Sequence, residues 1–219
     1  MRQAIFLVTV LLLLGCSDTQ LVDYWKSPDI DAYSPGKVLV IGLTSDQVAR
    51  QEFENQLKKE LELRGAEVER SLDFSDFELT TDQITEKQIN SLEDKLLNEG
   101  FDTILLTRVV GVEDKVVYRR EYKDYDEAYR SFRDDYLRHQ RVLYNPEYRS
   151  EYTVYHVETV MYCICPTKDR ALIWKGYVDI IDPKLKEAKK TIKRYVNLVI
   201  VAMEELSLVN PQLEPLNQQ

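Results

Sequence analysis

The sequence predicts an α/β fold. We expect a two-layer or three-layer βαβαβ unit, followed by an antiparallel β-hairpin and a long C-terminal helix, built around a mixed sheet. Apolar β-branched runs alternate with amphipathic stretches between residues 37 and 110, which is typical of parallel strands joined by right-handed helical crossovers. After residue 150 the alternation stops, and two strand-like stretches precede a long helical period.

The βαβαβ unit begins at Lys37–Leu43, a continuous apolar run that predicts a buried central strand. Thr44 or Ser45 then caps a helix that runs to about Arg64, where Gly65 ends it. We expect the buried stripe of this helix to comprise Ala49, Phe53, Leu57 and Leu61.

A second, more polar strand is expected over residues 66–74, near an edge of the sheet. Thr85 and Gln88 have the spacing of a capping box, so a helix begins there and ends at Gly100. Residues 101–110 form the third strand. Two apolar residues flank the cap at the positions of a hydrophobic staple, namely Ile84 and Ile89.

The hairpin is expected from Tyr152–Cys165 and Ala171–Ile181, which a short polar turn separates. Asp182 and Pro183 would open the last helix as its cap and first turn. Its apolar face is predicted to consist of Leu185, Ala188, Ile192, Tyr195, Val199, Ala202 and Leu206.

The N-terminus has the pattern of an export signal. Arg2 precedes an apolar run that is too short to span a bilayer, and the run ends in Leu13-Leu14-Gly15-Cys16. This tetrapeptide resembles the lipobox of bacterial lipoproteins. The resemblance implies removal of residues 1–15 and a diacylglycerol and an N-acyl chain, such as palmitate, on Cys16. An ordinary signal peptide with a chance cysteine is the alternative.

The remaining chain divides by composition. Residues 16–36, rich in Ser, Asp and Pro, are expected to form a lipidated tether, and residues 37–209 a single α/β domain. A tyrosine-rich insertion at about 118–150 interrupts that domain, and 210–219 form a loose tail.

The chain is acidic, with 29 basic and 38 acidic residues among 219. An acidic chain is repelled by phosphate backbones, so nucleic acid is excluded as an expected partner. Anionic lipid would not attract the chain as a whole either, which leaves membrane binding to the acyl chains on Cys16.

Cys163 and Cys165 are the other two cysteines. If both lie in one strand, their Cα atoms are roughly 6.5 to 7 Å apart, at the limit for a disulfide. Buried unpaired thiols are therefore favoured, while a strained disulfide or a metal site remains open. No complete zinc ligand set accompanies these two residues, so no cofactor is expected.

Nine of the 14 tyrosines lie between Tyr118 and Tyr155. A helix over about 124–142, followed by a loop at Asn145-Pro146, is favoured over a long, loosely ordered excursion between two strands. Such a helix would align an aromatic seam, which makes it a candidate surface for a partner protein. The same rings could instead pack on the domain's own sheet or stack on a sugar. The seam consists of Tyr122, Tyr125, Tyr129, Phe132 and Tyr136.

Catalytic signatures are absent from the sequence. There is no glycine-rich phosphate loop, nucleophile elbow or His-Glu-x-x-His motif. Glu158 lies in an apolar stretch, and we expect it to pair with an arginine such as Arg108 rather than to act in catalysis. The chain is therefore predicted not to be an enzyme and to have no small-molecule substrate.

The order of elements resembles a known family. After the lipobox come the Lys37–Leu43 strand, two helix-strand units, Val157-Glu158-Thr159, and then Leu172-Ile173-Trp174-Lys175-Gly176 with a final helix. The chain resembles bacterial envelope lipoproteins over residues 37–208. It is similar, more loosely, to periplasmic domains of the curli secretion-channel lipoprotein, the penicillin-binding-protein activator lipoproteins and the Tol-system N-terminal domain.

The resemblance implies a non-enzymatic lipoprotein that binds or scaffolds another envelope protein. A self-assembling, ring-forming secretion or structural component is the alternative. Ser17, directly after Cys16, implies sorting to the outer membrane under the enterobacterial rule, with the domain in the periplasm.

Overall fold

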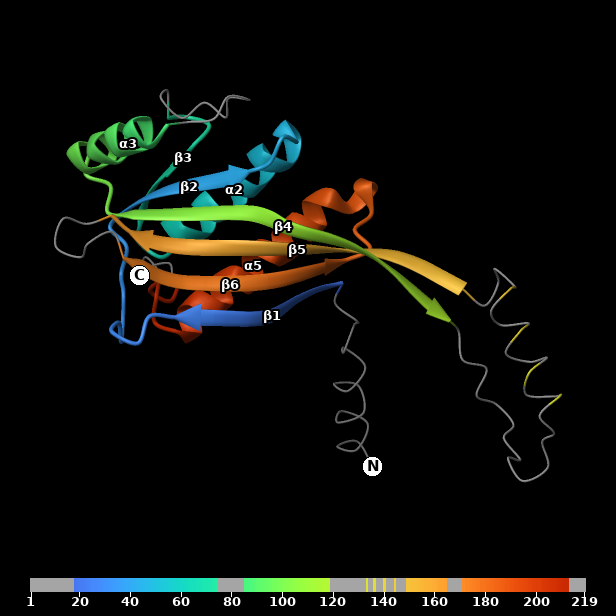
Figure 1. Cartoon of the computed structure of the whole chain (residues 1–219). Coiled ribbons are helices and arrows are strands. Elements are labelled where there is room, and N and C mark those ends of the chain that lie inside the picture. Colours follow the sequence, from blue (N-terminus) through green and yellow to red (C-terminus); the bar gives the residue numbers. More distant parts are fainter. Residues whose placement is uncertain are drawn as a thin grey trace, which may run out of the picture.

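The computed structural model describes residues 18–74, 85–118, 149–164 and 171–212, together with Arg133, Tyr136, Gln140 and Tyr144. In this part of the chain six strands form one sheet in the order β1-β6-β5-β4-β2-β3 (Figure 1). β2 runs parallel to β3 and β4, whereas β4, β5, β6 and β1 follow one another antiparallel. The predicted mixed sheet is confirmed. Its strands are β1 (Thr19–Lys26), β2 (Lys37–Leu43), β3 (Glu67–Arg70), β4 (Thr103–Tyr118), β5 (Arg149–Cys163) and β6 (Leu172–Ile181).

Strand β1 corrects the prediction of a tether over residues 16–36. β1 pairs with β6 from Thr19↔Ile180 to Lys26↔Trp174 and forms an edge of the sheet. The Lys26 ammonium also donates a hydrogen bond to the carbonyl of Leu206 at 2.8 Å. The strand-forming residues of β1 make only a short run between Ser, Asp and Pro residues. A single edge strand leaves little periodicity in a sequence, so this run was not recognised as a strand.

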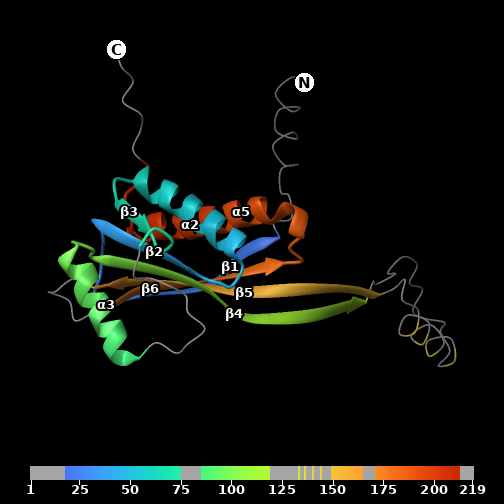
Figure 2. The same cartoon turned by 90° about the horizontal axis from the view of Figure 1, so that it is seen from above.

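The helices lie on both faces of the sheet. Figure 2 shows α2 (Gln47–Glu62) and α5 (Ala188–Glu205) on one face and α3 (Glu86–Asn98) on the other. The rings of Phe53 in α2 and Tyr195 in α5 meet edge to face, with centroids 6.1 Å apart. The larger core lies under α2 and α5, and a smaller core under α3 contains Leu39, Ile41, Phe74, Leu96, Phe101 and Ile164.

Of the three predicted N-terminal helix caps, the structure confirms one. The Thr85 amide donates to Gln88 at 2.8 Å and the Thr85 side chain accepts from the Gln88 amide, which confirms the capping box. Ile84, one half of the predicted staple, lies outside the described residues. The cap of α2 is Asp46, not Thr44 or Ser45, because its carboxylate accepts two amide hydrogen bonds at 3.0 Å.

The start of the last helix also differs from the prediction. The Asp182 amide donates to the carbonyl of Thr153 in β5 at 2.8 Å, so Asp182 still belongs to the end of the sheet. A short 3₁₀ turn, η4 (Leu185–Glu187), precedes α5, and Leu185 is 96% exposed rather than buried. The buried residues of α5 are Thr191, Tyr195, Val196, Val199, Ile200, Ala202 and Met203.

Cys163 corrects the preference for unpaired thiols. It is fully buried at the end of β5 and takes part in a disulfide bond. Cys163 and Cys165 do not share one strand, because β5 ends at Cys163. Strand geometry therefore does not limit how residue 165, which lies outside the described residues, is placed.

Candidate functional site

Strands β4 and β5 continue together beyond the rest of the sheet (Figures 1 and 2). β2 pairs with β4 only as far as Arg108, and β6 pairs with β5 only from Val154 onward. The β4–β5 register nevertheless continues to Tyr118↔Arg149. We call residues 112–118 and 149–155 the ribbon; Val154 and Tyr155, at its base, still pair with β6. It carries the tyrosine-rich insertion at its far end.

The ribbon exposes apolar side chains next to charged ones. Val112 is 58% exposed, and Val116 and Val117 are each 47% exposed. Glu113 and Lys115 lie between them and form an ion pair at 3.3 Å. Isolated two-stranded ribbons are marginally stable in water at best. This geometry is therefore typical of a segment that packs against something further.

The predicted aromatic seam lies mostly outside the described residues. Cys16, the predicted lipid-bearing residue, lies outside them too, as do Tyr122, Tyr125, Tyr129 and Phe132. Tyr136 is described: it is helical and 58% exposed. Arg133, Gln140 and Tyr144 are helical as well, and Tyr144 is 74% exposed. Arg133, Tyr136 and Gln140 agree with the helix predicted over about 124–142, and Tyr144 is helical just beyond its predicted end, while packing of the seam stays a prediction.

A polar cluster marks the base of the ribbon. The His156 Nδ1 atom lies 2.6 Å from the Asp179 carboxylate, and its Nε2 atom lies 3.6 Å from Glu113. The β4–β5 register shifts here between Val109 and Gly111. A Cβ atom on Gly111 would lie 3.3 Å from the His156 ring, so the shift brings the backbone close to the histidine. This bulge redirects the two strands out of the sheet.

Glu158 pairs with Arg108, as predicted. The Arg108 guanidinium donates to Glu158 at 2.7 and 2.9 Å, and Glu158 is only 4% exposed. Tyr177 on β6 lies in the same row of the sheet. Its hydrogen bond to Glu158, together with burial, raises the pKa of the Tyr177 phenol, which therefore stays protonated as a donor. Both partners fix the position of the Glu158 carboxylate in the sheet.

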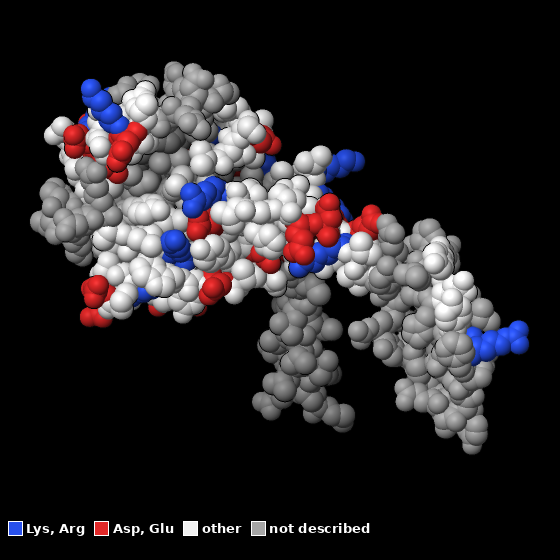
Figure 3. All heavy atoms as spheres, viewed as in Figure 1, with Lys and Arg blue, Asp and Glu red and all other residues white. Residues whose placement is uncertain are grey.

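Figure 3 shows the face of the molecule that carries this row. Small groups of Lys, Arg, Asp and Glu are scattered among uncharged residues, and neither sign dominates the described part of the face. At its edge, Trp25 of β1 is 43% exposed. A mixed surface of this kind suits a protein partner better than a polyanion.

Two further polar networks are buried and serve the fold. Glu54 is fully buried and accepts from Arg50, Ser71 and the Gly42 amide at 3.1, 2.6 and 2.9 Å. On the other side of the core, Thr159 joins the hydroxyls of Thr107 and Tyr195 at 2.7 and 2.6 Å. Burial raises the pKa of the Tyr195 phenol, so it too remains protonated.

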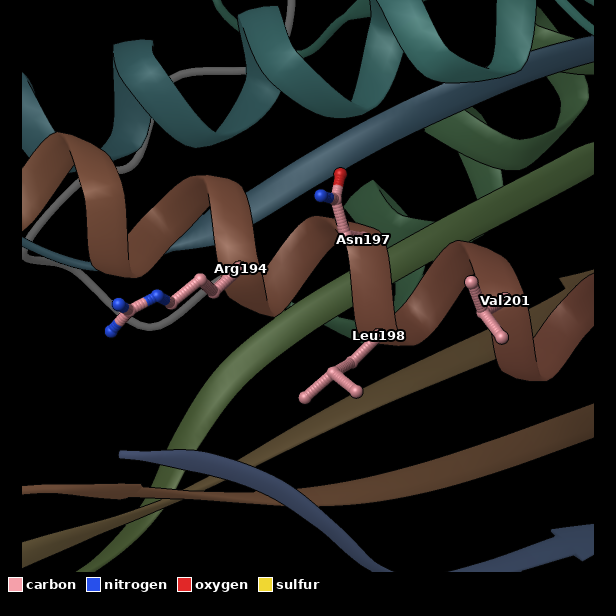
Figure 4. A pocket seen from close by; sticks show the side chains of 4 residues that line it. All are labelled: Arg194, Asn197, Leu198 and Val201. Carbon is pink, nitrogen blue, oxygen red and sulfur yellow. The ribbon is translucent and has the colours of Figure 1, made fainter. Parts of the chain in front are cut away.

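One hollow of the described surface is lined by Arg194, Asn197, Leu198 and Val201, all from α5, and Figure 4 shows these side chains diverging along the helix. Within residues 18–212 as described, no group of three or more His, Cys, Asp and Glu is placed to hold a metal ion. No helix in the same part of the chain is long and apolar enough to cross a membrane.

Comparison with known proteins gives distant structural likenesses. No family model matches the sequence, and no curated protein is significantly similar to it. The PelC dodecamer subunit from Paraburkholderia phytofirmans is 10% identical with a TM-score of 0.43, over 90% of this chain and 99% of that one. Lipoprotein GNA1162 from Neisseria meningitidis is 11% identical with a TM-score of 0.39, over 75% and 98%.

A DUF4136 family protein from Bacteroides thetaiotaomicron is 11% identical with a TM-score of 0.41, over 87% of this chain and 98% of that one. Likenesses of this size leave the function to be argued from the chain's own residues. The resemblances to the curli, penicillin-binding-protein activator and Tol-system domains stay predictions.

Proposed function

We propose that this chain is a non-enzymatic envelope lipoprotein that docks another envelope protein through the ribbon and the tyrosine-rich insertion. The geometry and exposure of the ribbon support this proposal. β4 and β5 stay paired past both neighbouring strands while exposing Val112, Val116 and Val117. A ribbon with valines in water gains from being covered, because each buried square ångström of apolar surface stabilises by about 25 cal/mol.

The chemistry of the ribbon favours a protein as its partner. Glu113, Asp114 and Lys115 separate Val112 from Val116 and Val117, so no continuous lipid-facing apolar band is formed. Exposed Tyr136 and Tyr144 lie beyond its end. Tyrosine is enriched at protein interfaces, since it buries a large area while its hydroxyl still finds a partner.

Two observations about cysteines support an envelope location. The Leu13-Leu14-Gly15-Cys16 pattern supports a lipid anchor at Cys16. The disulfide of Cys163 supports an exported chain, because such bonds persist in oxidising compartments and are rare in the cytosol. We propose the outer membrane, with the domain in the periplasm, from Ser17.

A non-enzymatic role fits how the candidate groups are used. Glu158 is held between Arg108 and Tyr177, and Glu54 is fully occupied by Arg50, Ser71 and backbone amides. A general acid or base needs an accessible, convergent site with a suitable pKa. Both carboxylates therefore stabilise the packing of strands and helices.

Affinity capture from membranes tests the docking proposal. The triple variant Val112→Thr, Val116→Thr, Val117→Thr keeps β-branched side chains on the ribbon and removes three exposed methyl surfaces. Its control is Val48→Thr with Val201→Thr, because these valines are 73% and 48% exposed on helices α2 and α5. We expect the triple variant to lose one cross-linked envelope protein that the control retains. Equal recovery by both variants would refute the ribbon as the contact.

Self-assembly through a sheet edge is the second candidate, and β1 supports it. β1 is an edge strand with Val22, Tyr24 and Trp25 at 49%, 50% and 43% exposure, whereas the opposite edge, β3, is short and charged. Sedimentation velocity of the chain from residue 16, with Cys16→Ser, separates the candidates. A monomer at micromolar concentration rules out stable rings, while a discrete oligomer that Val22→Lys dissociates would favour them.

A further inference from the structure

The segment from Lys184 to Arg194 is strongly basic in an otherwise acidic chain. It contains six basic residues and one acidic residue, Glu187, while the whole chain has a net charge of -9. The segment comprises η4 and the first turns of α5. Its basic residues are Lys184, Lys186, Lys189, Lys190, Lys193 and Arg194.

Most of this charge is presented to solvent. The side chains of Lys189 and Lys190 are 82% and 61% exposed, and their ion pairs, with Glu52 and Glu187, span 3.4 and 3.5 Å. Lys184, Lys186 and Lys193 are exposed and form no ion pair with the described residues. Leu185, between two of these lysines, is 96% exposed, more than any other large apolar side chain in the described part of the chain.

This placement does not serve the helix. The N-terminal end of a helix carries partial positive charge, so acidic residues are favoured there and lysines are disfavoured. α5 has no acidic residue in its first turn and no side chain that caps it. The lysines at this end oppose helix formation, which points to a role outside the fold.

The basic segment lies beside the start of β1. The Arg194 guanidinium forms an ion pair with Asp18, and the Ile181 amide donates to the Asp18 carbonyl at 2.7 Å. In Figures 1 and 2, the beginning of β1, the end of β6 and the beginning of α5 lie at the same end of the sheet. A lipid anchor two residues before Asp18 would bring this end of the domain to the membrane, because two residues of chain span at most about 7 Å.

We propose that this end of the domain, with Lys184, Leu185, Lys186, Lys189 and Lys190 at its centre, lies on the bilayer and binds anionic lipid headgroups. The inference rests on the proposed lipid anchor at Cys16, because the anchor brings this end to the membrane. The ammonium groups meet lipid phosphates, and Leu185 enters the interface between headgroups and acyl chains. The ribbon leaves the sheet at this same end (Figure 1).

Vesicle flotation without the anchor tests the surface alone. The chain from residue 16 with Cys16→Ser is mixed at low salt with vesicles of phosphatidylcholine, or of phosphatidylcholine with phosphatidylglycerol. We expect binding to the anionic vesicles only. Because each lysine near such a surface is worth about a fivefold change in binding, Lys184→Gln with Lys186→Gln, Lys189→Gln and Lys190→Gln should weaken it at least about tenfold.

The matched control replaces four lysines elsewhere, namely Lys58, Lys59, Lys87 and Lys175, by glutamine. Circular dichroism confirms that each variant is folded. Retained binding by the control supports the assigned surface. An equal loss in both variants, or equal binding to neutral and anionic vesicles, overturns it.

A second measurement uses the lipidated full chain in vesicles that contain nitroxide-labelled phospholipid. A fluorophore on Leu185→Cys should be quenched, whereas one on Val201→Cys, near the other end of α5, should not. Processing of Cys16→Ala tests the anchor separately. Normal processing would refute the anchor without affecting the flotation result, and equal quenching at 185 and 201 would refute the basic surface.

Discussion

Strands β4 and β5 behave differently along their length, although one antiparallel register joins them throughout. In the body of the sheet their side chains are enclosed: Leu105 and Met161, which pair directly, are both fully buried. In the ribbon, Val116 is 47% exposed. Backbone pairing joins β4 and β5 in the body and in the ribbon alike, so the difference in side-chain exposure comes from the elements that cover them. In the described residues, helices and neighbouring strands cover the body and leave valines of the ribbon exposed.

The largest effect is expected where a buried charge supports the body. Glu54→Ala removes the acceptor for Arg50, Ser71 and the Gly42 amide, and Arg50 is only 3% exposed. Breaking a buried pair in this way should cost about 3–5 kcal/mol of unfolding free energy. Urea denaturation measures it. Glu62→Gln, which removes an exposed pair with Lys58 at 3.5 Å, is the control and should change stability by less than about 1 kcal/mol.

A direct comparison of the two halves uses one strand. Leu105→Ala in the body of β4 should destabilise by about 2–5 kcal/mol, because it leaves a cavity. Val116→Ala in the ribbon should change stability by no more than about 0.5 kcal/mol, since its side chain is largely exposed. Similar losses of unfolding free energy at both positions would show that the ribbon is part of the domain's own core.

A third comparison uses the Arg108–Glu158 pair, which joins β4 to β5. Arg108→Met removes the cation that holds Glu158, which is 4% exposed. A buried acceptor that loses its partner costs about 1–3 kcal/mol, and the 43% exposure of the Arg108 side chain places the loss at the lower end. A double-mutant cycle with Glu158→Gln measures the coupling. A coupling of zero would contradict a structural role for the pair.

The smallest effect concerns the tyrosines of the body. Burial raises the pKa of Tyr33 and Tyr195, and the hydrogen bond to Glu158 raises that of Tyr177, relative to the unfolded chain. Above about pH 10 the unfolded state therefore binds fewer protons than the folded state, so stability falls as pH rises.

Tyr195→Phe should cost about 1 kcal/mol at neutral pH, through its lost hydrogen bond to Thr159, and should flatten the alkaline decline. Urea midpoints at several pH values measure both effects. Tyr24→Phe is the control, because that ring is 50% exposed. An unchanged alkaline slope in Tyr195→Phe would contradict the assignment.

The sequence predicted those parts of the fold that have strong local signals. The Thr85–Gln88 capping box, the buried run at Lys37–Leu43 and the Arg108–Glu158 pair are confirmed. β1 was missed because its place in the sheet depends on pairing with distant β6, which leaves no local pattern. The ribbon was missed for the same reason. Val112, Val116 and Val117 are strand-forming residues, but the ribbon extends past the sheet because β2 and β6 end earlier, which no local pattern shows.

Site-specific photo-cross-linking would show whether the insertion contacts another envelope protein. A photoreactive phenylalanine analogue replaces Tyr136, near the end of the ribbon, or Tyr24, on the edge of the body; the two rings have similar exposure, 58% and 50%. The lipidated chain is irradiated in membranes, and its adducts are identified by mass spectrometry. If the insertion docks an envelope protein, we expect a discrete adduct with that protein at position 136 and none at position 24. The same adduct at both positions, or adducts only with a second copy through position 24, would contradict it.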